Sequence, residues 1–200
     1  MKKIILHTDS LNERGTSVAV FDYAYFLREH LGMVPVIAFN KKCDTNLSDS
    51  IARFQKEFQV IGYEDFETMN GIDADYFYAI KYGNKDALIK KGSTNLIQSV
   101  FVSDSNQVHG DAYAVVSEWM SSKSNYQIPY VPHMINLPDH NNHVRNEIGI
   151  PDSHVVIGRL GGFETFDIPF VNEVIQKVLR QRDDIWFFLM NTPNAIKHER

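Results

Sequence analysis

Disulfide bonds are excluded within this chain, because Cys43 is its only cysteine. A protein without disulfides is typical of a reducing compartment. Long hydrophobic runs are also missing. Residues 1–3 precede only a short apolar stretch at 4–8, and no stretch has the length of a membrane span. We therefore expect a cytoplasmic protein, and a peripheral contact with a membrane surface stays open.

Basic residues are too few for a nucleic-acid-binding surface. Lysine and arginine number 20 against 25 aspartate and glutamate residues, which gives a formal net charge of -5. Binding to nucleic acid depends on neutralising phosphates with a basic surface. The short lysine pairs at 41–42 and 90–91 are typical of solvated surface, so we expect no nucleic-acid partner.

What the sequence does contain is a regular alternation of strand and helix patterns, with 44% hydrophobic residues to build a core. The apolar run at 3–8 predicts a buried strand, and the run at 34–39 predicts a second. Between them, Thr16 or Ser17 is expected to cap a helix that ends at Gly32. This order of strand, loop, helix and strand predicts a parallel α/β sheet.

The same alternation continues along the chain. Further strands are predicted at 58–62, 74–82, 96–102 and 111–116. Further helices are predicted at 50–57, 85–91 and 118–122, the last one capped by Ser117.

A change of composition separates a second unit from the first. Residues 126–142 hold three prolines, at positions 129, 132 and 138, which is typical of a linker. After it come a short helix at 143–148 and a strand at 155–158. A glycine loop, a helix capped by Asp167 and a strand at 185–190 follow.

The pattern therefore predicts two parallel sheets, of which the second is represented by one β-α-β unit. We expect a first domain over 1–128, a linker over 129–142 and an incomplete domain over 143–200. Two strands alone make a poor independent sheet. Either the natural chain is longer, or this unit is covered by the first domain or by a partner chain.

Both glycine loops are candidate phosphate-binding sites. Gly15 and Thr16 stand where a strand passes into a helix, and the free N–H groups of a helix start attract anions. Arg159 precedes Gly161 and Gly162 at the end of a strand, where an arginine can form two hydrogen bonds to a diphosphate. A plain turn and a surface arginine are the alternatives.

Four histidines need separate interpretations. His109 lies beside a glycine and can transfer protons or contact an acceptor, or it can simply make a local hydrogen bond. His133 is interpreted as part of the linker. His140 and His143 stand near Asp139 with a spacing that metal sites use, but no further ligand is evident, so no metal is expected.

Aromatic residues gather in the strand predicted at 74–82, at Tyr76, Phe77, Tyr78 and Tyr82. Such residues can stack on sugar rings. Packing within the core is the favoured interpretation here, since aromatic residues are common in half-buried strands.

Four stretches resemble the GT-B glycosyltransferases of the group 1 family, which are retaining enzymes with nucleotide-sugar donors. Residues 7–24, from His-Thr-Asp through Gly-Thr-Ser to Phe-Asp-Tyr-Ala, resemble the family's first strand, loop and helix. Residues 109–119 resemble its strand and Ser-x-Trp helix start. Residues 131–138 resemble its interdomain linker, and 156–160, with its Gly-Arg pair, resemble the opening strand of its donor domain.

The resemblance implies two Rossmann-like domains that face a cleft, the first binding an acceptor and the second a nucleotide sugar. Arg159 would then hold the donor diphosphate, with Gly15 and Thr16 closing over the phosphates from the other side. His109 lies near the place of an acceptor-side histidine. The implied reaction moves a sugar to a hydroxyl of a glycan, lipid or small molecule, with no cofactor or metal.

Two departures from the family pattern bear on this interpretation. The family often has a lysine five residues after the arginine of its Gly-Arg pair, and here the residue is Glu164. Its paired-glutamate motif would fall beyond Arg200. A non-catalytic binding or assembly module derived from a glycosyltransferase is therefore the alternative. An epimerase-like fold is disfavoured because no G-x-G-x-x-G follows the first strand.

Overall fold

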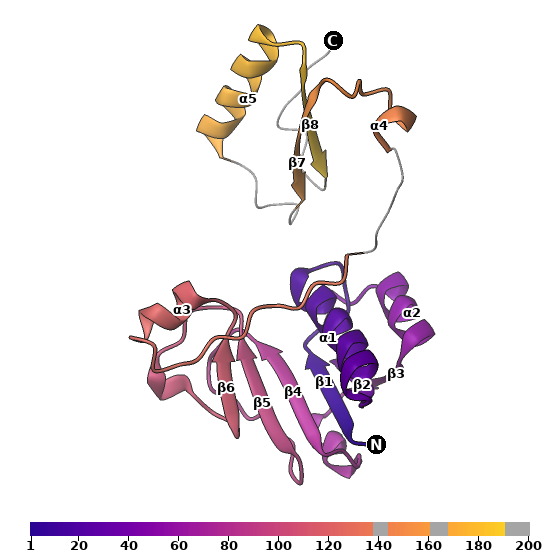
Figure 1. The fold of residues 1–200 in the computed structure, drawn as a ribbon. Helices are drawn as coiled ribbons and strands as arrows, with labels where there is room; N and C mark the ends of the chain where they lie inside the picture. The colour runs from indigo at the N-terminus through magenta and orange to yellow at the C-terminus, as the bar shows by residue number, and fades with distance from the viewer. Residues whose placement is uncertain (138–143, 161–167, 191–200) are drawn as a thin grey trace. The chain divides into compact units, whose positions relative to one another are not determined.

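A computed structural model describes residues 1–137, 144–160 and 168–190 (Figure 1). The chain divides into two compact units, residues 1–137 and 138–200. Within the described ranges, no helix is long and apolar enough to cross a membrane.

The first unit is built on a six-stranded sheet with all neighbours parallel. Its strands are β1 (Lys3–Thr8), β2 (Val34–Asn40), β3 (Gln59–Tyr63), β4 (Tyr76–Lys81), β5 (Thr94–Ser99) and β6 (Ala112–Val115). Their order is β3-β2-β1-β4-β5-β6, which is that of a Rossmann-like α/β domain. The predicted parallel sheet and its strands are confirmed, with bounds that differ by a few residues.

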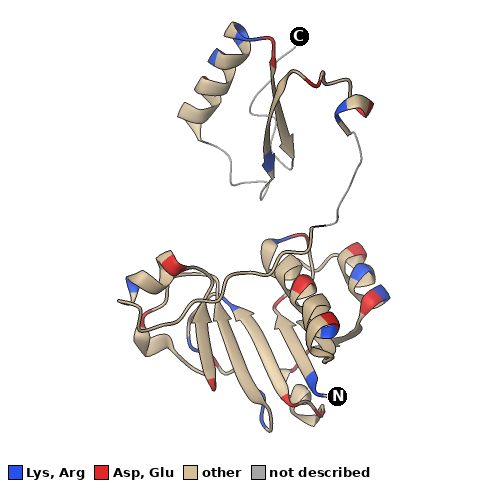
Figure 2. Ribbon diagram, viewed as in Figure 1, with Lys and Arg blue, Asp and Glu red and all other residues tan. Residues whose placement is uncertain are grey.

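Two helices cover one face of this sheet, namely α1 (Gly15–Leu31) and α2 (Ser48–Glu57). Acidic and basic positions are interspersed along both (Figure 2). Gly32 ends α1 with a φ of 59°, as its sequence predicts. The predicted start of α1 is wrong, because its N-cap is Arg14. The Ser17 hydroxyl is directed back to the Ser10 carbonyl and caps no helix amide.

The opposite face is covered by shorter elements. The 3-10 helix η1 (Phe66–Gly71) and α3 (Glu118–Lys123) bring Met69 and Met120 into its core. Ser117 caps α3 as predicted, accepting a hydrogen bond from the Met120 amide. A second 3-10 helix, η2 (Ser105–Gln107), precedes β6.

The helix predicted at 85–91 is absent. The Asp86 carboxylate accepts a hydrogen bond from the Leu88 amide and binds Lys81 Nζ at 2.6 Å. Lys81 Nζ also donates to the Leu88 carbonyl at 3.1 Å. These contacts with a buried lysine hold the segment in a looped path and replace the hydrogen bonds of a helix.

The segment after α3 pairs with β6 and so extends the edge of the sheet. Tyr130 forms a parallel bridge with Val115, and the Val131 amide donates to the Val115 carbonyl at 2.8 Å. Gln98 Nε2 donates to the Val131 carbonyl at 2.6 Å. The linker was expected to start at 129, whereas the first unit extends to residue 137.

The second unit contains α4 (Val144–Glu147), β7 (Val155–Leu160), α5 (Pro169–Gln181) and β8 (Ile185–Met190). β7 and β8 are parallel, so the predicted β-α-β unit is confirmed. Ile175 of α5 and Ile185 of β8 are buried in its small core. The predicted helix cap Asp167 lies outside the described residues.

Candidate functional site

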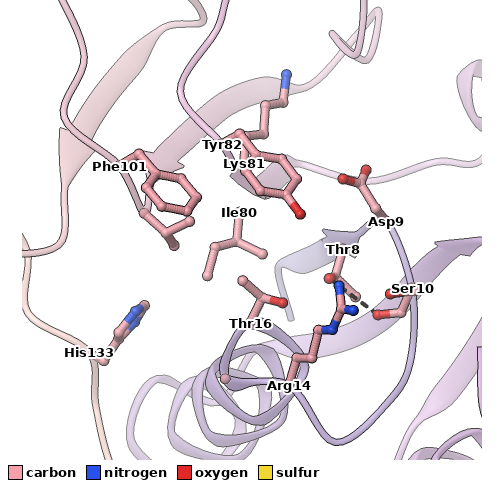
Figure 3. Close-up of a pocket in the computed structure, with 12 residues that line it drawn as sticks. Thr8, Asp9, Ser10, Arg14, Thr16, Ile80, Lys81, Tyr82, Phe101 and His133 are labelled. Atoms are coloured by element: carbon pink, nitrogen blue, oxygen red, sulfur yellow. Dashed lines mark hydrogen bonds between the residues drawn. The ribbon is translucent and has the colours of Figure 1, made fainter. Parts of the chain in front are cut away.

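A pocket lies at the carboxyl edge of the first sheet, where the strand order reverses. β1 and β4 are neighbours there, and the chain continues from them in opposite directions across the sheet. In open α/β sheets this arrangement leaves a crevice in which ligands bind. The pocket has a volume of about 330 Å³, within the range of small-molecule sites. It is lined by 8–10, 14–16, 80–82, 100–101 and His133 (Figure 3).

The loop between β1 and α1 is held by its own side chains. Ser17 Oγ donates to the Ser10 carbonyl at 2.9 Å and accepts from the Asn12 amide at 3.1 Å. Asn12 Oδ1 accepts from the Arg14 amide at 2.9 Å, and Asn12 Nδ2 donates to Ser10 Oγ. Since Asn12 and Ser17 are buried, these bonds fix the path of the loop at the pocket.

The first turn of α1 therefore opens directly onto the pocket. Gly15 and Thr16, predicted from the sequence as phosphate ligands, both line it. The first amides of a helix have no acceptor within that helix and carry its positive dipole end. Arg14 adds an exposed guanidinium at the same position. An added Cβ at Gly15 would meet no atom within 4 Å, so the approach to this backbone is open.

Asp9 supplies a carboxylate to the pocket lining, apart from Arg14 at the start of α1 (Figure 3). Figure 3 shows Asp9 and Arg14 on either side of Thr8, at the end of β1. Loss of hydration raises the pKa of the Asp9 carboxyl, and the nearby charge of Asp86 adds to this effect. Asp9 can accept hydrogen bonds from hydroxyl groups of a ligand.

Apolar and aromatic groups form the remaining walls. Ile80 lies near the end of β4, and Val100 directly follows β5. The Tyr82 and Phe101 rings stand side by side above Ile80 (Figure 3). This half of the pocket suits the apolar face of a ligand, whereas the start of α1 suits an anionic group.

His133 closes one end of the pocket. Its Nδ1 is 3.0 Å from the Tyr23 hydroxyl of α1, and the two rings are 5.8 Å apart. Burial lowers the pKa of His133 and raises that of Tyr23, so both are held in their neutral forms at pH 7. The interpretation of His133 as part of a linker missed its place in the pocket.

An ion pair between a buried lysine and an exposed carboxylate supports the site from beneath. Lys81 continues the alternation of β4 and carries its amino group to the sheet face opposite α1, where Nζ binds Asp86. Burial lowers the pKa of Lys81, and the Asp86 carboxylate opposes that effect. A buried charge that is paired and hydrogen-bonded in this way fixes the end of β4.

His109 belongs to this supporting layer and is not among the residues lining the pocket. Its Nδ1 lies 2.7 Å from the Gln107 carbonyl, which only accepts, so Nδ1 carries a proton. Its Nε2 lies 3.2 Å from Lys81 Nζ, which donates. Both ring nitrogens are therefore engaged in hydrogen bonds.

A second buried histidine lies on the same face. His7 has no exposed surface, and its Nε2 is 2.6 Å from the Tyr63 hydroxyl. Burial, with the charge of Lys81 as a second cause, lowers the pKa of His7 to about 3. Burial likewise raises the pKa of Tyr63 to about 12. Both rings are neutral around pH 7.

The remaining predicted phosphate ligands belong to the second unit. Arg159 lies on β7 in register with Leu189 of β8, and it is partly exposed. Gly161, Gly162 and Glu164 lie outside the described residues. Among the residues that the structure does describe, no group of three or more potential ligands could hold a metal ion.

The aromatic residues predicted in the strand at 74–82 have different environments in the structure. Phe77 is buried in the core and the Tyr78 hydroxyl donates to Gln98 Oε1, so packing is confirmed for both. The Tyr76 hydroxyl accepts from Lys2 Nζ at 2.9 Å at the other end of the strand. For Tyr82 the packing interpretation is wrong, because its side chain is 62% exposed at the pocket.

Phe101 was not singled out from the sequence. Tyr82 and Phe101 fall at the carboxyl ends of the strands predicted at 74–82 and 96–102, but in the structure they follow the ends of β4 and β5 and line the pocket.

Comparisons with known proteins give no further assignment: no family model, no curated protein and no solved structure matches this chain.

Proposed function

We propose that the chain is part of a GT-B glycosyltransferase that transfers a sugar from a nucleotide-sugar donor to a hydroxyl acceptor. One observation carries the proposal. At the switch point of a Rossmann-like sheet, a single pocket combines the open start of α1 with aromatic and carboxylate groups suited to sugars. The resemblance of the loops to the group 1 family supports the same interpretation.

In this proposal, the phosphates of the donor bind at the start of α1. Gly15 and Thr16 offer backbone N–H groups, and Arg14 offers a guanidinium that matches phosphate geometry. Arg159 of the second unit is proposed as a further phosphate ligand. Transfer of the sugar leaves a nucleoside diphosphate, whose developing negative charge these groups would stabilise.

We propose that Asp9 and the aromatic half of the pocket contact the sugar groups of the donor and the acceptor. His109 is given a positioning role, because its hydrogen bond to Lys81 supports the end of β4 that carries Tyr82.

Isothermal titration with a panel of UDP-, GDP-, ADP- and dTDP-sugars tests the proposal. We expect at least one donor to bind with a stoichiometry of about one. Arg14→Ala and Arg159→Ala should each weaken that binding by about tenfold to a hundredfold, as expected for the loss of a charged hydrogen bond. Arg53→Ala on α2 and Arg180→Ala on α5 are matched controls with exposed guanidinium groups.

The transfer reaction is tested with the same donor by following release of the nucleoside diphosphate in the presence of sugar acceptors. Release that requires Arg14 supports an enzyme. Donor binding with no release under any acceptor would instead favour the non-catalytic binding module. No binding of any donor to the folded protein would contradict the proposal as a whole.

A further inference from the structure

Two large aromatic side chains stand exposed at the pocket in a fixed arrangement. Tyr82 is 62% exposed and Phe101 is 55% exposed, although both are apolar enough for the core. Their ring centroids are 5.5 Å apart with an interplanar angle of 6°, so the rings are stacked in parallel. The exposure of so much aromatic surface within a pocket marks a contact for a ligand.

The backbone that carries these rings is fixed by buried hydroxyl groups. Ser99 Oγ donates to the Phe101 carbonyl at 2.7 Å and lies 3.0 Å from Ser103 Oγ. The Tyr113 hydroxyl lies within hydrogen-bond distance of the Gly83 carbonyl, at 2.9 Å, directly after Tyr82. Ser99, Ser103 and Tyr113 are all buried. This cluster therefore fixes the backbone that carries the two rings before any ligand binds, which lowers the entropy cost of binding.

We propose that Tyr82 and Phe101 form a platform for the flat C–H face of a pyranose ring. The inference rests on the proposed function in taking this ring to be the acceptor sugar. Because the two rings already contact each other, a planar base has no space between them, and a ligand must pack on an outer face. A sugar ring packs on one aromatic face in this way while its edge stays free for hydrogen bonds.

The polar groups around the platform match the edge of a sugar. Asp9 offers a carboxylate that accepts from hydroxyl groups, and the Thr16 hydroxyl both donates and accepts. A lipid chain would leave these groups without partners, which is unfavourable in a pocket. The volume of about 330 Å³ is large enough for a small ring with a few substituents.

Saturation-transfer difference NMR tests this inference without any nucleotide. The probes are the methyl glycosides of glucose, galactose and mannose, with sorbitol as the acyclic control of matched polarity. We expect saturation on the ring C–H protons of at least one glycoside, and none above background for sorbitol. Tyr82→Ala and Phe101→Ala should each weaken the binding by about tenfold, as expected for the loss of an aromatic contact.

Trp119→Ala is the matched control, because Trp119 is equally exposed at 62% and lies on α3 outside the pocket lining. It should leave the saturation unchanged. Phe101→Leu keeps an apolar side chain without the ring and should resemble Phe101→Ala. Amide spectra of each variant establish that it remains folded.

The result separates this inference from the proposed function. Glycoside saturation that depends on Tyr82 supports the platform even if no nucleotide sugar binds. Glycosides and sorbitol giving equal signals, or signals that survive both alanine variants, overturn the platform even if nucleotide sugars bind at Arg14. In a separate measurement with a nucleotide-sugar donor as the probe, saturation of nucleobase protons that requires Tyr82 would also overturn it, because the platform would then hold a base.

Discussion

Gly83 is the residue on which the aromatic platform depends most directly, so its replacement by alanine tests the packing beneath the pocket. Its φ of +115° is unfavourable for any residue with a side chain. An added Cβ would lie 2.3 Å from Ser103 Oγ and 2.4 Å from Ser99 Oγ, and both atoms are buried. Alanine must therefore force these hydroxyl groups apart.

The expected destabilisation follows from these two effects. The backbone conformation costs about 1–2 kcal/mol for a residue with a Cβ. Separation of the hydroxyl groups weakens the Ser99–Ser103 and Tyr113–Ser103 hydrogen bonds, each worth about 1 kcal/mol. We therefore expect Gly83→Ala to lower the free energy of unfolding by about 3–4 kcal/mol, measured by urea denaturation with circular dichroism.

Gly92→Ala is the matched control for this experiment. Gly92 has a φ of +75°, and no atom lies within 4 Å of an added Cβ. It should show only the backbone effect, about 1–2 kcal/mol. If Gly83→Ala were no more destabilising than Gly92→Ala, the buried hydroxyl cluster would not be packed as described, and the support for the platform would be lost.

Three further predictions concern the layers around the pocket. Ser17→Ala removes the hydroxyl that joins Ser10 and Asn12, so we expect a loss of about 1–3 kcal/mol in urea denaturation, and no loss would contradict the described loop. The pKa of His7 is lowered to about 3 from 6.5, so the unfolded chain binds the extra proton between these values and stability falls as the pH falls below 6.5. Wild type should then lose about 2 kcal/mol between pH 7.5 and pH 5 that His7→Phe does not lose, and equal losses would refute this origin. In ¹⁵N-correlated spectra the His109 ring should show a proton on Nδ1 and none on Nε2, and the reverse tautomer would exclude its hydrogen bond to Lys81.

The secondary structure of this protein follows closely from its hydrophobic patterns. The strands of both sheets and the helix ending at Gly32 are local features, because apolar runs and a terminal glycine determine them. The parallel direction of the strands also follows, since each connection is long enough to cross the sheet. The position of β4 beside β1 does not follow, because it depends on contacts between distant residues.

The errors arose where distant groups determine local conformation. The segment around Asp86 has a helical composition, but the buried amino group of Lys81 binds its carboxylate and a carbonyl, and no helix forms. Thr16 and Ser17 are good capping residues, yet the Asn12 side chain sets the start of the helix earlier.

The candidate site could be predicted only in part. Gly15 and Thr16 were identified because a glycine loop between strand and helix is a local pattern, and the structure places both at the pocket. Tyr82, Phe101 and His133 come from three distant segments and meet only through the strand order and the path of the chain after α3. A sequence pattern cannot show that an aromatic residue lies at a pocket when the pocket depends on the whole sheet.

Amide NMR with a nucleotide-sugar donor is the first test of whether the start of α1 binds the phosphates of that donor. We expect saturable shifts centred on the Gly15 and Thr16 amides, which Arg14→Ala reduces strongly and Arg53→Ala leaves unchanged. Shifts centred away from these amides, or shifts that Arg14→Ala leaves intact, would contradict the claim that phosphates bind at this helix.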